Sequence, residues 1–371
     1  MWENLMRKSI AIVLVLVLTL SVVAIPAAAQ SEEAWECPDG YEGQTLQLFN
    51  WADYIADDTV SNFEEACGVT IEYSVFGTND QLLTTLQAGN AAYDIVVPSI
   101  TQIPNFAELG LIQPLDHSLI PNIADLTVII PDMPIDPNNE YSAPYQWGTI
   151  GIAYDNTIVD TPITSWDDFF AYDGRVAWLN DSQIFLKIAL IKLGYPYSSL
   201  DEAQIHEAAD YLLTVPQSDI FAITDNEQAD LLLRGEVDAI IVQSRGAANV
   251  ISECECDDFT YVLPSDGFIP YSDVLAIPAN APNPALANVF IDYILNPQVN
   301  ADLSNALGSA SFLMDSQMLI DEDIMNNGVS YVPIPELPQF RESRIIIEEI
   351  GQTTPIYNDE WNRIRAELSG G

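Results

Sequence analysis

Basic side chains are scarce in this sequence. Lysine and arginine together number 11 against 55 aspartates and glutamates, so the formal net charge of the 371 residues is −44. A protein with such a field repels nucleic acid and anionic lipid and attracts small cations. Solubility explains most of this charge, and steering of a cationic ligand would be an additional effect. We therefore expect no nucleic-acid partner.

Cysteine and histidine are also rare. His117 and His206 are far apart in the sequence, which gives little support to a metal site of cysteine and histidine. We predict neither a metal nor another cofactor. The cysteines are interpreted as structural, and in an exported protein they allow three disulfide pairings, which stay open. They are Cys37, Cys67, Cys254 and Cys256.

One hydrophobic run is long, residues 9–26, "SIAIVLVLVLTLSVVAIP", which follows Arg7 and Lys8 and precedes a small-residue site ending at Ala29. This order is typical of a secretory signal peptide. The run is almost long enough to span a bilayer, so an uncleaved anchor is the alternative. Cleavage would remove Arg7, Lys8 and Glu3, which leaves nine basic and 54 acidic side chains. We predict export to the periplasm or to the extracellular face of the cytoplasmic membrane.

Strand and helix patterns alternate from residue 45 with little between them. Apolar "LQLF" (46–49), alternating "VTIEYSVF" (69–76) and the continuous run "YDIVVPS" (93–99) predict strands. The segments between them, 57–68 and 78–89, have helical periodicity and end in glycine. This β-α-β-α-β order is the unit of a doubly wound sheet.

A second alternating block begins near residue 148. It includes the predicted strands "RVAWLND" (175–181) and "VDAIIV" (237–242), the helix at 182–194 between them, and a helix pair at 283–295 and 296–308. Two α/β lobes in one exported chain, without a cofactor motif, suggest a protein that traps a ligand between the lobes.

Polar and aromatic side chains gather where these strands end. "FNWADY" (49–54) follows the first strand and "PSIT" (98–101) the third, and open α/β sheets bind ligands beyond the carboxyl ends of their strands. A buried ammonium needs a carboxylate partner, worth roughly 4 kcal/mol at about 4 Å, and each aromatic face adds about 0.5–2 kcal/mol. The candidate ligand-binding residues are Trp51, Asp53, Tyr54, Ser99, Asp181, Gln243, Tyr271 and Asp273.

Most of these candidates have a structural alternative. Asp181 could cap the following helix, Ser99 could complete a turn, and Asp53 could be a solvated loop acid. Tyr54 and Tyr271 could be core aromatics whose hydroxyl groups reach water.

No motif for catalysis stands out. The sequence has no glycine-rich phosphate loop, and neither histidine has the context of a catalytic triad. Pairs of carboxylates could serve a glycosidase, but among so many acids any pair is a weak indication. We predict that the protein is not an enzyme, with a secreted hydrolase and a purely structural exported protein as alternatives. Trp147 and Trp166 are interpreted as packing residues.

Several stretches together match one known family. They include "LFNWADYIADDTVSNFEEACGV" (48–69), "YDIVVPS", "ITSWDDFF" (163–170), "GEVDAIIV" (235–242) and "DVLAIPANAPNPALANVFIDYILNPQV" (273–299). On these residues, the chain from 45 to the end resembles the spermidine/putrescine-binding proteins of polyamine ABC transporters. The resemblance implies a type II periplasmic-binding-protein-like fold, in which two doubly wound α/β lobes close over a ligand.

The resemblance also implies a domain organisation and a function. The signal peptide (1–29) and an acidic leader (30–44) would precede the lobes, with 45–146 and 272–318 in lobe 1 and 147–271 and 319–371 in lobe 2. A monomer would capture a putrescine-like diamine or spermidine in the cleft and deliver it to a membrane ABC permease. The alternative ligand is another organic cation or an amino-acid derivative.

Individual positions carry over from the family. Tyr271 and Asp273 match the aromatic residue and the carboxylate at the return crossing, where the aspartate holds an amine. Trp51, Asp53 and Tyr54 match the family's first ligand-binding segment. Ser99 matches the serine after the third strand, and Asp181 matches a carboxylate of the second lobe.

The sequence departs from the family at the far end of the site. Ile184 stands where the family has a glutamate, Gln243 where it has a stacking tryptophan, and Thr101 where some members have an aromatic residue. These changes favour a shorter diamine, or a cation with one amine and a less polar tail, over spermidine. The family's C-terminal glutamine aligns loosely with Ile347 and Glu348, and Asp225 is a candidate replacement acid.

Overall fold

The computed structural model describes residues 35–89, 92–124, 126, 136–197, 199–215, 220–224, 227–254, 256–331 and 350–369. The predicted signal peptide and the candidate residues Asp225, Ile347 and Glu348 lie outside the described residues.

The first elements confirm the predicted β-α-β-α-β order. They are β1 (Thr45–Trp51), α1 (Asp57–Cys67), β2 (Thr70–Phe76), α2 (Asn79–Ala88) and β3 (Ile95–Val96). β1 pairs in parallel with both β2 and β3, so the carboxyl ends of the three strands meet at one edge. Short elements follow: η1 (Ile100–Gln102), α3 (Ile103–Glu108), β4 (Ile112–Gln113), η2 (His117–Leu119), α4 (Pro121–Ala124) and η3 (Pro137–Asn139).

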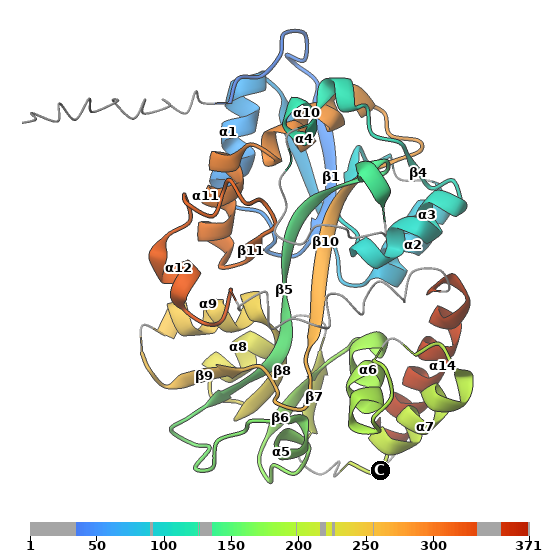
Figure 1. Ribbon diagram of the computed structural model, residues 1–371, viewed down its shortest axis with the longest axis vertical. Helices are drawn as coiled ribbons and strands as arrows, with labels where there is room; N and C mark the ends of the chain where they lie inside the picture. Colours follow the sequence, from blue (N-terminus) through green and yellow to red (C-terminus); the bar gives the residue numbers. More distant parts are fainter. Residues whose placement is uncertain are drawn as a thin grey trace, which may run out of the picture. The chain divides into compact units, whose positions relative to one another are not determined.

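Two long antiparallel strands, β5 (Ser142–Asp155) and β10 (Ile269–Pro278), lie side by side in the middle of the structure (Figure 1). Gly148 of β5 is opposite Tyr271 of β10. A Cβ atom at Gly148 would come 2.5 Å from the Tyr271 hydroxyl oxygen, so only glycine leaves room for this tyrosine ring.

The second predicted α/β block lies between β5 and β10 in the sequence. Its elements are α5 (Trp166–Phe170), β6 (Val176–Leu179), α6 (Ser182–Lys192), α7 (Glu202–Leu212), β7 (Ile220–Thr224), α8 (Gln228–Leu233), β8 (Ala239–Gln243), α9 (Ser244–Cys254) and β9 (Phe259–Val262). β6 pairs in parallel with β7 and β8.

The last elements include the predicted helix pair. They are α10 (Pro284–Ile294), α11 (Pro297–Leu307), β11 (Ala310–Ser311), α12 (Glu322–Asn326) and α14 (Ile350–Ser369). Across the described residues the strands follow the order β2-β1-β3-β10-β5-β8-β6-β7, with β4 paired to β10 and with β9 and β11 paired to β5.

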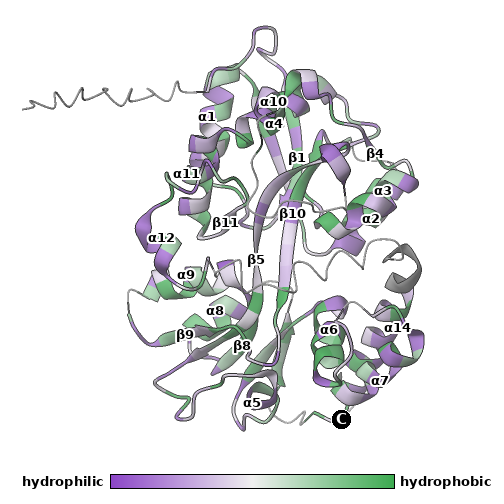
Figure 2. Ribbon diagram, in the orientation of Figure 1, coloured by the Kyte–Doolittle hydropathy of each residue, from purple (hydrophilic) through white to green (hydrophobic). Residues whose placement is uncertain are grey.

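Two separate hydrophobic cores form along the sheet, one around the first part of β5 and the other around its second part. We call lobe 1 the part whose core contains α1, α10 and residues Ala143 and Tyr145 of β5. We call lobe 2 the part whose core contains α5, α6, α7, α14 and residues Ile150 and Ile152 of β5. Figure 2 shows α6 and β8 as largely hydrophobic, as expected for elements buried within lobe 2. The predicted boundaries at 146/147 and 271/272 therefore fall within β5 and β10, the strands shared by the lobes.

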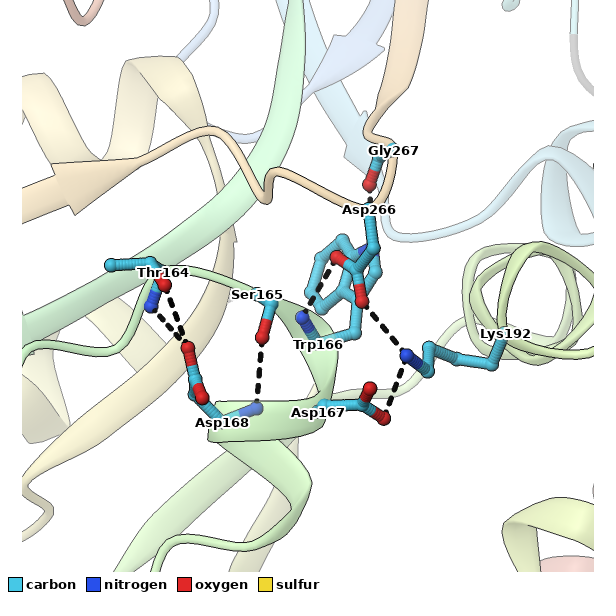
Figure 3. Close-up of polar contacts among 8 residues, drawn as sticks. All are labelled: Thr164, Ser165, Trp166, Asp167, Asp168, Lys192, Asp266 and Gly267. Atoms are coloured by element: carbon cyan, nitrogen blue, oxygen red, sulfur yellow. Dashed lines mark hydrogen bonds and ion pairs between the residues drawn. The ribbon is translucent and has the colours of Figure 1, made fainter.

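The "SWDDF" segment has a structural role in lobe 2 (Figure 3). Trp166 is fully buried, and its indole N–H donates to the Gly267 carbonyl at 2.6 Å. Lys192 at the end of α6 forms ion pairs with Asp167 at 2.6 Å and Asp266 at 2.9 Å. These contacts tie α5 and α6 to the segment before β10 and confirm the packing role predicted for Trp166. Trp147 is fully buried as well.

Both disulfides are within the described residues. They join Cys37 to Cys67 and Cys254 to Cys256, which is consistent with the structural interpretation of the cysteines. Among the described helices, none has the length and hydrophobicity needed to cross a bilayer.

Candidate functional site

A cavity of about 390 Å³ lies between the lobes, where the ends of strands from both of them meet. Residues that follow β1, β3 and β6 line it, together with the last residue of β8 and part of β10. Seven of the eight predicted residues line the cavity, although Tyr271 and Asp273 lie within β10 and not at a strand end. The seven are Trp51, Tyr54, Ser99, Asp181, Gln243, Tyr271 and Asp273.

Asp53 is the predicted residue that does not line the cavity. Its side chain is exposed, and its backbone has a φ of 51°, in the left-handed region that aspartate tolerates in tight turns. Its carbonyl oxygen accepts a hydrogen bond of 2.7 Å from the Arg245 guanidinium. Asp53 thus contributes its backbone, and the structure gives its carboxylate no contact with the cavity.

Asp273 is the most deeply buried carboxylate of the cavity, with 5% of its surface exposed. The Ser99 hydroxyl donates to its Oδ1 atom at 2.9 Å, across an isolated bridge between the two residues. Burial raises the pKa of Asp273 to about 7, although the hydroxyl groups of Ser99 and Tyr54 and the nearby Arg245 charge lower it. A cation bound beside this carboxylate would relieve the cost of its desolvation.

Three aromatic side chains that line the cavity have polar atoms without a partner in the described part of the chain. These atoms are the hydroxyl groups of Tyr54 and Tyr271 and the indole nitrogen of Trp51. Burial raises the pKa of Tyr271 to about 12 and that of Tyr54 well above its ordinary value, so both hydroxyls keep their protons near neutral pH. Buried polar groups normally find partners, and a ligand in the cavity would supply them.

Asp181 has both of the roles weighed from the sequence. It caps α6 by accepting hydrogen bonds from the backbone N–H groups of Gln183 at 2.9 Å and Ile184 at 3.0 Å. It also lines the cavity, where desolvation raises its pKa. Because the cap uses one of its oxygens, the other is available to a ligand.

Several charged residues of the cavity were not predicted from the sequence. Lys187 lies in the second turn of α6, Arg245 is the second residue of α9, which follows β8, and Arg365 lies on the C-terminal helix α14. Asp80, at the start of α2, is an additional acid. Arg245 could have been found, because it follows a strand end; the faces that α6 and α14 turn to the cavity depend on tertiary packing.

Two sets of hydrogen bonds join the lobes at the rim of the cavity. The Arg245 guanidinium, from lobe 2, donates to the carbonyl oxygens of Asp53 at 2.7 Å and Ala52 at 3.4 Å in lobe 1. It also stacks on the Tyr54 ring at 4.9 Å from the centroid. On α14, the Asn358 amide donates to Asp80 of lobe 1 at 2.7 Å. The lobes are therefore in contact around the cavity.

The positions at which the sequence departs from the family also line the cavity, namely Thr101, Ile184 and Gln243. At these positions the cavity is lined by a hydroxyl group, an alkyl chain and an amide. In the described lining there is no histidine or cysteine, and in the described chain no group of three metal-ligating side chains occurs. The arrangement suits capture of a solute that carries an ammonium group.

Comparisons with known proteins agree with this geometry. The family described as "Bacterial extracellular solute-binding protein" matches residues 58–327. The spermidine/putrescine-binding periplasmic protein of Escherichia coli K12 is 29% identical over 329 residues, which cover 88% of this chain and 92% of the relative. The putrescine-binding periplasmic protein PotF of the same organism is 30% identical over 312 residues, which cover 79% of this chain and 84% of the relative.

A solved structure shows the same fold. The substrate-binding protein PotD of a spermidine/putrescine ABC transporter from Streptococcus pneumoniae superposes with a TM-score of 0.71 at 25% identity, covering 88% of this chain and 100% of that one. The predicted type II periplasmic-binding-protein-like fold and the family resemblance are thereby confirmed. The chain belongs to the family of bacterial extracellular solute-binding proteins.

Proposed function

We propose that this protein captures a polyamine or a related linear amine in the cavity between its lobes and delivers it to an ABC permease. The observation that carries the proposal is the Asp273 carboxylate, which is 5% exposed and accepts a hydrogen bond from Ser99. An ammonium group would pair with this charge, and the unpartnered hydroxyls of Tyr54 and Tyr271 can accept its remaining hydrogens. Relatives named for spermidine and putrescine support the ligand class.

The remaining parts of the proposal follow from the same family. The protein would be exported, directed by residues 1–29, and would work as a monomer that releases its solute chemically unchanged. The lobes would move about a hinge at 146/147 in β5, at 271/272 in β10 and near 318/319. A ligand that contacts both lobes would favour the closed arrangement, which the hydrogen bonds of Arg245 and Asn358 also stabilise.

Isothermal titration calorimetry tests this function. The protein recovered after export is unfolded and refolded to remove carried solute. It is then titrated with putrescine, cadaverine, spermidine, spermine, glycine betaine, 4-aminobutanoate and 5-aminopentanoate. We expect saturable one-to-one binding of at least one linear amine, and recovery of that amine unchanged by mass spectrometry. A folded protein that binds no linear amine, or that converts one to a product, would contradict the proposal.

A further inference from the structure

The charges that line the cavity are balanced, in contrast to those of the whole chain. Among the described lining residues, three are acidic and three are basic, although the sequence holds only 11 basic residues against 55 acidic ones. A diamine carries two positive charges into a closed site, and a site for it needs an excess of negative charge. The acidic residues are Asp80, Asp181 and Asp273, and the basic residues are Lys187, Arg245 and Arg365.

Lys187 is the lining cation with the fewest contacts that the structure describes. Its ammonium donates one hydrogen bond of 3.3 Å to the Gln183 amide oxygen and forms no ion pair within the described residues. Desolvation lowers its pKa, and the charge of Asp181 opposes this effect. Lysine has three donor hydrogens and no acceptor, so Lys187 can donate to a ligand that offers an acceptor oxygen.

The other unpartnered groups of the cavity point to the same requirement. The Trp51 indole N–H is buried without an acceptor in the described structure, and it too can only donate. A ligand ammonium also only donates, so it can satisfy neither Trp51 nor Lys187. The alkyl side chain of Ile184, one turn before Lys187, leaves no carboxylate at its position to hold a second ammonium.

We propose that the solute is a linear amino carboxylate, whose ammonium pairs with Asp273 and whose carboxylate pairs with Lys187. This inference rests on the proposed function, because it assumes that the cavity is a solute site with an amine end at Asp273. A zwitterion adds no net charge to a balanced cavity, and each of its two charged groups finds a partner of opposite sign. Its methylene chain would contact Ile184 and the aromatic rings.

Length-matched ligands give the sharpest test. We would titrate the refolded protein with 4-aminobutanoate, 5-aminopentanoate and 6-aminohexanoate beside putrescine, cadaverine and 1,6-diaminohexane. We expect at least one amino carboxylate to bind at least about tenfold more tightly than the diamine of the same chain length, since the diamine places a second cation beside Lys187. Equal or tighter binding of the diamine would overturn the inference and leave the proposed function intact. If neither a diamine nor an amino carboxylate binds, the inference and the proposed function are both wrong.

Variants of Lys187 identify the carboxylate partner. Lys187→Met should weaken binding of the amino carboxylate by about tenfold or more without weakening binding of the diamine. Lys187→Arg should retain the preference for the amino carboxylate over the diamine. Lys192→Met is the matched control, because Lys192 lies on the same helix but pairs with Asp167 and Asp266 outside the cavity lining.

Circular dichroism shows which variants are folded, and Lys187→Gln replaces Lys187→Met if the latter does not fold. Unchanged selectivity in the folded variant would overturn the assignment of Lys187.

Discussion

Replacement of Asp273 by asparagine should stabilise the ligand-free protein while it impairs binding. The pKa of Asp273 is raised by burial from an ordinary 3.8 to about 7. The folded state therefore holds the proton more tightly than the unfolded state, so the stability of the wild type falls as the pH rises from about 4 to about 7. At about 1.36 kcal/mol for each pH unit between the two values, ionised Asp273 lowers the free energy of unfolding by roughly 4 kcal/mol above pH 7.

The pH dependence separates this effect from a general change in packing. Asp273 lowers the free energy of unfolding by about 2 kcal/mol at pH 5 and by about 4 kcal/mol at pH 8. Asparagine does not titrate, so the stability gain of Asp273→Asn over the wild type should grow by about 2–3 kcal/mol between these pH values. Urea unfolding of both ligand-free proteins at pH 5 and pH 8 measures it, with Asp323→Asn on exposed α12 as the control for loss of one charge.

A gain that is the same at pH 5 and pH 8, or a loss at both, would refute the reasoning. It would mean that Asp273 is ionised in the folded protein across this range, and hence that some group in the cavity already neutralises it. The amine end of the proposed site would then have to be placed elsewhere.

Three other predictions concern the walls of the cavity and the pH dependence of binding. Trp51→Ala should weaken linear-amine binding by about 1–2 kcal/mol in calorimetry, because it removes an aromatic wall; unchanged affinity would assign Trp51 to packing. Gly148→Ala should destabilise the fold by about 1–3 kcal/mol in urea unfolding, because the new methyl group meets Tyr271 and Ser244 at 2.5 Å. Affinity for a linear amine should fall by up to about tenfold for each pH unit below 7, because protonation of Asp273 competes with the ammonium; a flat profile from pH 5 to 8 would contradict this.

Local sequence patterns were sufficient to predict the parts of the site that lie next to strands. Alternation and apolar runs show where strands end, and parallel strands bring those ends together, so Tyr54 and Ser99 could be assigned to one place. Tyr271 and Asp273 instead lie within β10, which is antiparallel to β3 and β5. Asp53 shows the limit of this reasoning. It lies within the same short segment as Trp51 and Tyr54, but the direction of a side chain in a tight turn depends on backbone angles that the pattern does not encode.

The charged residues that alter the proposed ligand class could not be predicted in the same way. Whether Lys187 faces the cavity depends on how α6 packs against lobe 2. Asn358 and Arg365 come from a helix about 180 residues further along the chain than Asp181, and tertiary packing alone brings that helix to the cavity.

The measurement that tests the central claim most directly is a calorimetric titration of wild type and Asp273→Asn in parallel, with the linear amine or amino carboxylate that binds the wild type most tightly. The account predicts one-to-one binding to the wild type and a loss of about 2–5 kcal/mol in the variant, since its ammonium would then be buried without a countercharge. Equal affinity for the two folded proteins would contradict it, because the solute would then be held without the carboxylate on which the proposed function depends.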